Sequence, residues 1–92
     1  MGRVDSKVAL ITGAGQGLGE ASARALHKEG AVVVIADVNI TLGQALAAQL
    51  GDSALFVELD VTSEAAWQHA IATTLKQLGR IDVLVNNAGI VL

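Results

Sequence analysis

Four short apolar runs, separated by three stretches with helical spacing, constrain the fold of this chain more than any other feature. The runs cover residues 7–12, 31–36, 54–59 and 81–86, and the second is rich in β-branched side chains. Because they are continuous rather than alternating, we expect strands that are buried on both faces, as in a parallel sheet.

The stretches between these runs carry apolar stripes that predict helices. The stripe residues are Leu18, Ala21, Ser22, Ala25 and Leu26; Leu42, Ala45, Leu46 and Leu50; and Trp67, Ala70, Ile71, Thr74, Leu75 and Leu78. A glycine follows each stripe (Gly30, Gly51 and Gly79), and glycine readily adopts the left-handed conformation that ends a helix. Thr41 and Gln44 match a capping box and predict the start of the second helix.

The resulting βαβαβαβ pattern predicts an α/β chain with a doubly wound parallel sheet of the Rossmann type. Crossovers between parallel strands are right-handed in nearly all cases, and in a doubly wound sheet the four strands would take the order 3-2-1-4. A length of 92 residues allows one domain at most. A nucleotide would bind beyond the carboxyl ends of strands 1 and 4.

Composition and charge exclude several classes of partner. The net charge of −3 argues against a nucleic-acid surface. The longest apolar run, residues 31–36, is far shorter than the roughly 18 residues of a membrane-spanning helix. Arg3, Asp5 and Lys7 stand where a signal peptide would be apolar. Because neither a membrane span nor a signal peptide is indicated, we expect a cytoplasmic location. With no cysteine and two histidines, we expect no metal site.

The segment Thr12–Gly19 joins the first strand to the first helix and contains four glycines. Neither G-x-G-x-x-G nor a P-loop occurs, but Thr-Gly-x-x-x-Gly-x-Gly does. Glycine loses the most backbone entropy on folding, so this loop is costly if it only turns the chain. Glycines that let backbone N–H groups approach a pyrophosphate at a helix N-terminus would explain it, and a tight strand-to-helix turn is the alternative.

Asp37 ends the second strand, 18 residues beyond Gly19. A carboxylate at this place can accept hydrogen bonds from both ribose hydroxyls of NAD and repels the 2′-phosphate of NADP. Its neighbours Ala14, Gln16, Val38 and Asn39 carry no charge. We therefore expect NAD rather than NADP, the alternative being a solvated aspartate in a turn or cap.

Four motifs in order resemble the N-terminal half of the short-chain dehydrogenases/reductases, over residues 7–91. They are Thr12-Gly13-x-x-x-Gly17-x-Gly19, Asp37, Asp60-Val61 and Asn86-Asn87-Ala88-Gly89. The resemblance implies that Gly13, Gly17, Leu18 and Gly19 hold the pyrophosphate region, that Gln16 also binds the cofactor, and that Asp37 holds the ribose. It also implies that Asp60 and Val61 bind the adenine, while Asn86, Ala88 and Gly89 line the adenosine side. Asp60 could equally help cap the helix that begins near Thr62 or Ser63, and Asn87 is expected to be mainly structural.

The resemblance further implies an NAD(H)-binding half of an oxidoreductase that moves a hydride between the nicotinamide and an alcohol or ketone. Members use a serine, a Tyr-x-x-x-Lys pair and an asparagine for proton transfer, and this chain has no tyrosine. We therefore expect residues 1–92 to be the N-terminal part of a single dinucleotide-binding domain, with no catalytic residue. The alternative is a free-standing nucleotide-binding module.

Residues 81–85 read as an interior strand, yet the order 3-2-1-4 leaves this strand at an edge. Asp82 is its only charge, and it contains neither proline nor lysine. Because an unprotected edge pairs readily with another chain, we expect a homo-oligomer, aggregation of the isolated chain, or a chain that is ordered only beside the rest of its polypeptide.

Overall fold

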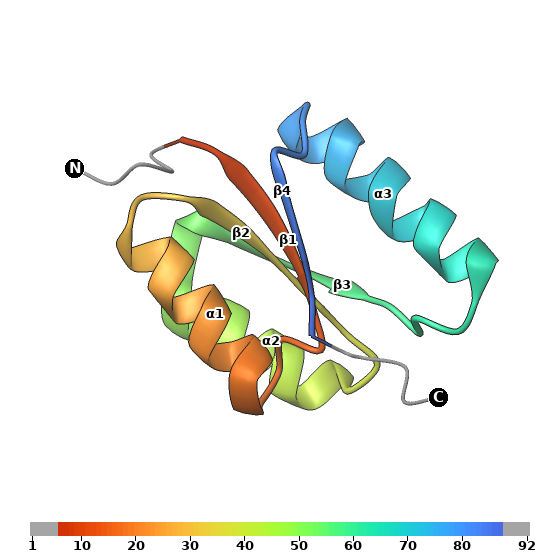
Figure 1. The fold of residues 1–92 in the computed structure, drawn as a ribbon, viewed down its shortest axis with the longest axis horizontal. Coiled ribbons are helices and arrows are strands. Elements are labelled where there is room, and N and C mark those ends of the chain that lie inside the picture. The colour runs from red at the N-terminus through yellow and green to blue at the C-terminus, as the bar shows by residue number, and fades with distance from the viewer. Residues whose placement is uncertain (1–5, 88–92) are drawn as a thin grey trace.

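The structure, a computed structural model, describes residues 6–87 and shows a four-stranded parallel sheet flanked by helices (Figure 1). Its elements follow in the order β1 (Val8–Thr12), α1 (Gly17–Lys28), β2 (Val32–Asp37), α2 (Ile40–Leu50), the short 3-10 helix η1 (Gly51–Ser53), β3 (Ala54–Glu58), α3 (Glu64–Leu78) and β4 (Val83–Asn86). The strand order is β3-β2-β1-β4, with every neighbouring pair parallel. This confirms the doubly wound 3-2-1-4 sheet.

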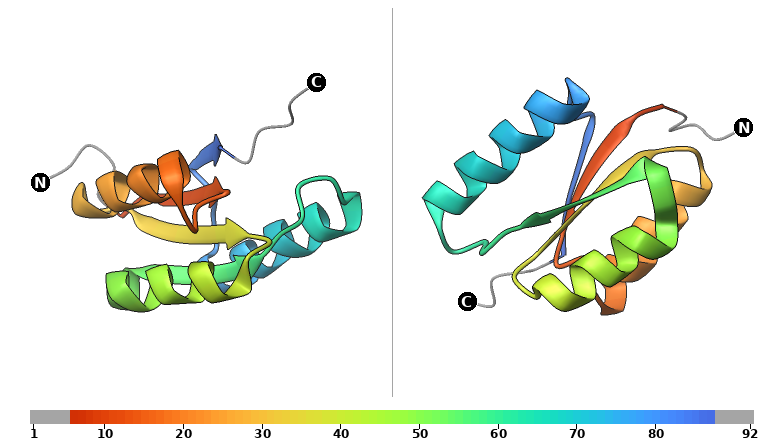
Figure 2. Two further views of the ribbon diagram at one scale, coloured as in Figure 1. Left: turned by 90° about the horizontal axis from the view of Figure 1, so that it is seen from below. Right: turned by 180° about the vertical axis from the view of Figure 1, so that it is seen from behind.

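Helices α1 and α2 cover one face of the sheet, and α3 covers the other (Figure 2). Alternate residues of β1 therefore enter two cores, because successive side chains of a strand point to opposite faces. Ala9 and Ile11 pack on the side of α1 and α2, whereas Val8 and Leu10 pack on the side of α3. All of β1 and nearly all of β2 are buried, which confirms burial on both faces for the two central strands, whereas the outer strands β3 and β4 are only partly buried.

The core-facing side of α1 differs from the predicted stripe. Leu18 is 80% exposed, and Ala21 and Ala25 are exposed as well. Gly19 and Ala23 are the buried residues of this helix. Leu26 of the predicted stripe does pack against this core. Glycine and alanine let α1 lie close to the sheet, which explains why Leu18 does not mark the packed face.

Helix α2 begins two residues earlier than the capping-box pattern suggested. The Asn39 side chain accepts a hydrogen bond from the Leu42 N–H at 2.9 Å, so Asn39 rather than Thr41 is the N-cap. Asparagine is among the preferred N-cap residues, and its short amide reaches the third helical N–H. The predicted helix stops hold, because the glycines after the three helices have positive φ: Gly30, Gly51 and Gly79.

Asp82 fastens β4 to β1 at the amino end of the sheet. The Val8 N–H donates to Asp82 Oδ2 at 2.8 Å, and the Asp82 N–H donates to the Val8 carbonyl at 2.8 Å. The Arg80 guanidinium donates to Oδ1 at 2.7 and 3.0 Å. The Arg80 and Val8 hydrogen bonds together lower the pKa of Asp82. The one charged residue of residues 81–85 thus holds the edge strand in register.

No helix within residues 6–87 has both the length and the hydropathy needed to cross a bilayer. The sheet is the framework for the loops that follow each strand, and these loops carry the predicted cofactor-binding residues.

Candidate functional site

The carboxyl ends of the four parallel strands lie along one edge of the sheet, and backbone hydrogen bonds hold their loops together (Figure 1). The Ala14 N–H donates to the Ala36 carbonyl at 3.3 Å, which joins the glycine loop to β2. The Leu59 N–H donates to the Asp37 carbonyl at 3.1 Å, which joins the loop after β3 to the end of β2. The structure thus gathers the first three predicted motifs at one edge.

The N-terminus of α1 lacks a side-chain cap. Gln16 occupies the N-cap position with extended backbone, but its side chain accepts no hydrogen bond from the helix. The other two α-helices of the described chain are capped, α2 by Asn39 and α3 by Ser63. Gln16, Gly17 and Leu18 are all exposed. The first backbone N–H groups of α1 are therefore open to an anion, which the helix dipole also favours.

Two glycines shape this open helix start in different ways. Gly17 has a φ of +64°, and a Cβ there would find no atom within 4 Å. A Cβ at Gly19 would overlap the Gly13 carbonyl group and lie 2.9 Å from the Ala14 Cα. The missing side chain of Gly19 therefore lets α1 lie against the loop, and that of Gly17 leaves free space beside the start of the helix. This arrangement fits a pyrophosphate held by backbone N–H groups.

Asp37 is buried at the carboxyl end of β2, with 8% of its surface exposed. Its Oδ2 accepts a hydrogen bond from the Gly15 N–H at 2.8 Å, and its Oδ1 accepts one from the Asn39 N–H at 2.8 Å. An ionised carboxylate offers about four acceptor positions, so each oxygen retains one. The carboxylate is therefore buried rather than solvated, while its hydrogen bond from the Asn39 N–H, two residues on, is the turn role that the alternative gave it.

Gly15 was not among the residues expected at the site. It is buried, and a Cβ there would lie 2.8 Å from Asp37 Oδ2. The sequence signal was present, since Gly15 is a fourth glycine at a position where Thr-Gly-x-x-x-Gly-x-Gly requires none.

Asp60 and Val61 begin the loop that follows β3. Asp60 Oδ1 accepts hydrogen bonds from the Thr62 hydroxyl at 2.6 Å and the Thr62 N–H at 2.9 Å, in that order the main causes that lower the pKa of Asp60. The cap of α3 is Ser63, whose Oγ accepts from the Ala66 N–H at 3.1 Å, so Asp60 shapes the preceding turn instead of capping the helix.

This turn leaves polar groups available. Within residues 6–87 no group donates to Asp60 Oδ2, and none accepts from the Val61 N–H. The Val61 carbonyl accepts from the indole Nε1 of Trp67 at 2.9 Å. Trp67 packs against the core on the α3 side, as the apolar stripe predicted.

The end of β4 is tied to β1 through Thr12. The Thr12 hydroxyl donates to Asn86 Oδ1 at 2.8 Å and accepts from the Asn87 N–H at 3.1 Å. Asn87 thus connects neighbouring strands through its backbone, while its Nδ2 is buried without a partner among the described residues. Ala88 and Gly89 lie outside the described residues.

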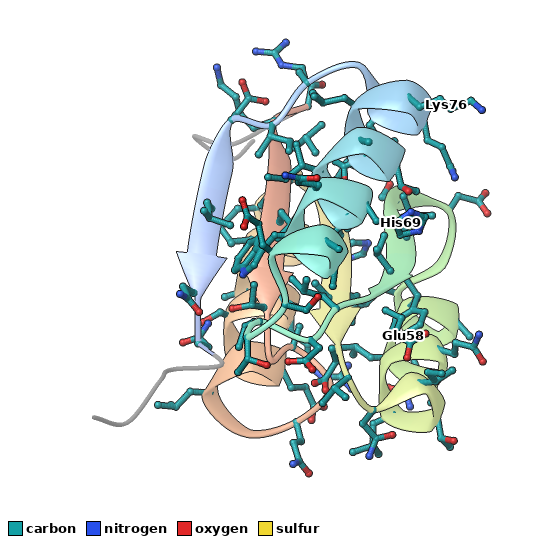
Figure 3. All side chains as sticks on the ribbon, turned by 90° about the vertical axis from the view of Figure 1, so that its right-hand side faces the viewer. Glu58, His69 and Lys76 are labelled. Carbon is teal, nitrogen blue, oxygen red and sulfur yellow. The ribbon has the colours of Figure 1, made fainter. Side chains whose placement is uncertain are left out.

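Three polar side chains of β3 and α3, which are labelled in Figure 3, do not form a second site. Glu58, His69 and Lys76 are exposed on β3 and α3, and no hydrogen bond or ion pair joins any two of them in the described part of the chain (Figure 3). Residues 6–87 form no pocket and contain no group of three or more side chains placed to bind a metal ion.

Comparison with known proteins places this geometry in a family. Residues 7–92 match the short chain dehydrogenase family. The chain is 48% identical over 90 residues to a 3-beta-hydroxysteroid dehydrogenase from Comamonas testosteroni, and 45% identical over 89 residues to a tropinone reductase-like 2 protein from Erythroxylum coca. These alignments cover 98% and 97% of this chain but 35% and 32% of the relatives. The chain therefore spans about a third of their length.

Solved structures agree with the sequence relatives. A 3-ketoacyl-(acyl-carrier-protein) reductase from Brucella melitensis, complexed with NADH, superimposes with a TM-score of 0.86 at 42% identity, covering 88% of this chain and 33% of the reductase. A hydroxysteroid dehydrogenase from Escherichia coli gives a TM-score of 0.88 at 38% identity, covering 96% and 39%. With the parallel sheet and the motifs along its carboxyl edge, these matches show that the chain belongs to the short-chain dehydrogenase family.

Proposed function

We propose that residues 1–92 form the NAD(H)-binding, N-terminal part of a single dinucleotide-binding domain in a short-chain oxidoreductase. The full-length enzyme would transfer a hydride between the nicotinamide, which supplies the redox chemistry, and an alcohol or ketone. The relatives named above are a hydroxysteroid dehydrogenase and a tropinone reductase-like protein, and one similar structure is a reductase in complex with NADH. Residues beyond Leu92 would handle the protons, since this sequence has no tyrosine.

The observation that carries the proposal is the buried Asp37 carboxylate beside the glycine loop. Its two remaining acceptor positions, one on each oxygen, suit the two vicinal hydroxyls of the adenosine ribose. A 2′-phosphate at the same place would put a second negative charge against this carboxylate, which favours NADH over NADPH.

The other assignments follow from position along the same edge. The open first turn of α1 would bind the pyrophosphate through backbone N–H groups, with Gly13 and Gly19 setting the loop and Gln16, Gly17 and Leu18 at the surface. Asp60 Oδ2 would accept from the adenine amino group, and the Val61 N–H would donate to the ring. Asn86, Ala88 and Gly89 would line the adenosine side.

Titration of NADH and NADPH into the full-length product of the gene tests the cofactor assignment. We expect tighter binding of NADH. Asp37→Ala combined with Val38→Arg should shift the preference toward NADPH, because it removes the repelling charge and supplies a phosphate partner. Equal affinities of the unmodified protein for the two cofactors would contradict the role of Asp37.

A turnover assay separates the two classes of function. The 92-residue chain by itself should bind the dinucleotide without turning over, since positioned acid–base groups alone contribute about 10²–10⁴-fold to catalysis. Secondary-alcohol oxidation by a chain of verified mass would overturn this assignment. A stop codon directly after Leu92 would favour the free-standing nucleotide-binding module.

A further inference from the structure

We infer that Gly15 is a positioning residue that sets the preference between NADH and NADPH by fixing the Asp37 carboxylate. The inference rests on the proposed function, because it concerns how Asp37 would select the ribose. Gly15 and Asp37 are 22 positions apart in sequence, yet the Gly15 N–H donates to Asp37 Oδ2 at 2.8 Å in a buried setting.

Space, rather than backbone conformation, explains the glycine at position 15. Its φ is not in the positive region, in contrast to that of Gly17 at +64°. A Cβ on Gly15 would lie 2.8 Å from Asp37 Oδ2 and 3.1 Å from the Cβ of Leu42. A Cβ at position 15 is therefore opposed by its neighbours Asp37 and Leu42, and not by the local backbone conformation.

Of the two neighbours, the carboxylate is the one that can move. The Leu42 Cβ is attached directly to the backbone of α2, whose N-terminus is fixed by Asn39. Asp37 Oδ2 is the end of a side chain and can rotate about χ1 and χ2. A methyl group at position 15 would thus turn the carboxylate and weaken its hydrogen bond to the Gly15 N–H.

A turned carboxylate would affect the two cofactors in opposite directions. It would no longer present one acceptor position on each oxygen to the ribose hydroxyls, so NADH would bind more weakly. It would also move its charge from the place of the 2′-phosphate, so NADPH would bind more tightly. A turned carboxylate therefore changes the ratio of the two dissociation constants, whereas general damage to the loop would weaken both cofactors and leave that ratio unchanged.

The test measures NADH and NADPH dissociation constants for the full-length product carrying Gly15→Ala, Asp37→Ala or both. Gly15→Ala should reduce the preference for NADH by about tenfold or more, the effect of one hydrogen bond to a charged group. In the Asp37→Ala background the same change should alter the preference by less than about twofold, because no carboxylate is left to turn. Gly17→Ala is the matched control, and it should weaken both cofactors with little change in their ratio, since a Cβ at Gly17 contacts nothing within 4 Å.

A second measurement needs neither cofactor nor the Gly15 variant. Amide hydrogen exchange should show Gly15 protected in the unmodified protein and more rapidly exchanging in Asp37→Ala, while Ala14, whose N–H donates to the Ala36 carbonyl, keeps its protection. Unchanged exchange at Gly15, or a Gly15→Ala ratio equal to that of Gly17→Ala, would overturn the inference while leaving the role of Asp37 intact. If Asp37→Ala itself leaves the NADH preference unchanged, both the inference and the cofactor assignment fail.

Discussion

Replacing Gly19 with alanine measures how tightly α1 is pressed against the glycine loop. A Cβ at Gly19 would overlap the Gly13 carbonyl group, and the Ala14 Cα is only 2.9 Å away. All of these are backbone atoms, so no flexible side chain can yield. Alanine adds up to about 1 kcal/mol of helix propensity, whereas overpacking costs about 1–3 kcal/mol. Because backbone must move here, we expect the upper part of that range and a net loss of about 2 kcal/mol.

The measurement is urea unfolding of the full-length product, followed by far-UV circular dichroism. Gly17→Ala serves as the comparison, because its cost is conformational rather than steric, about 1 kcal/mol for a residue held at positive φ. Asparagine tolerates this region better, so Gly17→Asn should recover part of the loss. Gly19→Asn should be less stable than Gly19→Ala. If Gly19→Ala is as stable as the original protein, the glycine loop can move away from α1 at no cost in free energy, and the argument is refuted.

Three further predictions concern the sheet and its edges. Asp82→Ala should lower Tm, because it leaves the buried N–H of Val8 without its carboxylate. Acid should also lower the stability of the fold, because the pKa of Asp82 is lower in the folded state than its ordinary value of 3.8. The stabilisation by ionised Asp82 is complete above pH 3.8 and is lost as the pH falls through the folded-state pKa. Gly43→Ala should destabilise by about 1 kcal/mol despite better helix propensity, since its Cβ would overlap the ring of Phe56; Phe56→Leu should relieve the loss in the same urea assay. The isolated 92-residue chain should self-associate through β4, where Leu84 is 57% exposed, and Leu84→Lys should reduce light scattering at equal concentration. A scattering signal unchanged by that substitution would point to another interface.

The strands of the sheet and their order could be predicted from the sequence, because the patterns that indicate them are local and recur along the chain. Each strand is a continuous apolar run, each helix is followed by a glycine, and the handedness of crossovers restricts the order of four parallel strands. The motif residues also follow from this order, since any residue just after a strand reaches the carboxyl edge. The strand boundaries were within two residues, and the largest difference among them is the start of β4 at Val83.

The missed features depend on distances between segments. Asn39 and Thr41, two positions apart, are both of residue types that cap helices, and the sequence alone did not decide between them. The packed face of α1 is set by the close approach of Gly19 to Gly13, so counting apolar residues put Leu18 on the wrong side. Gly15 has a role only because Asp37 lies beside it, which spacing alone does not reveal.

The uncapped start of α1 has a consequence for how this edge can be studied. Its proposed contacts come from the peptide N–H groups of Gln16, Gly17 and Leu18, and every residue type except proline supplies one. Alanine scanning of the exposed Gln16 and Leu18 would therefore leave the anion-binding groups in place and could report a silent surface. Replacing single amides with esters, which deletes one N–H while keeping the side chain, would map the same region directly. A residue-by-residue survey of side chains would miss a binding surface that belongs to the peptide backbone.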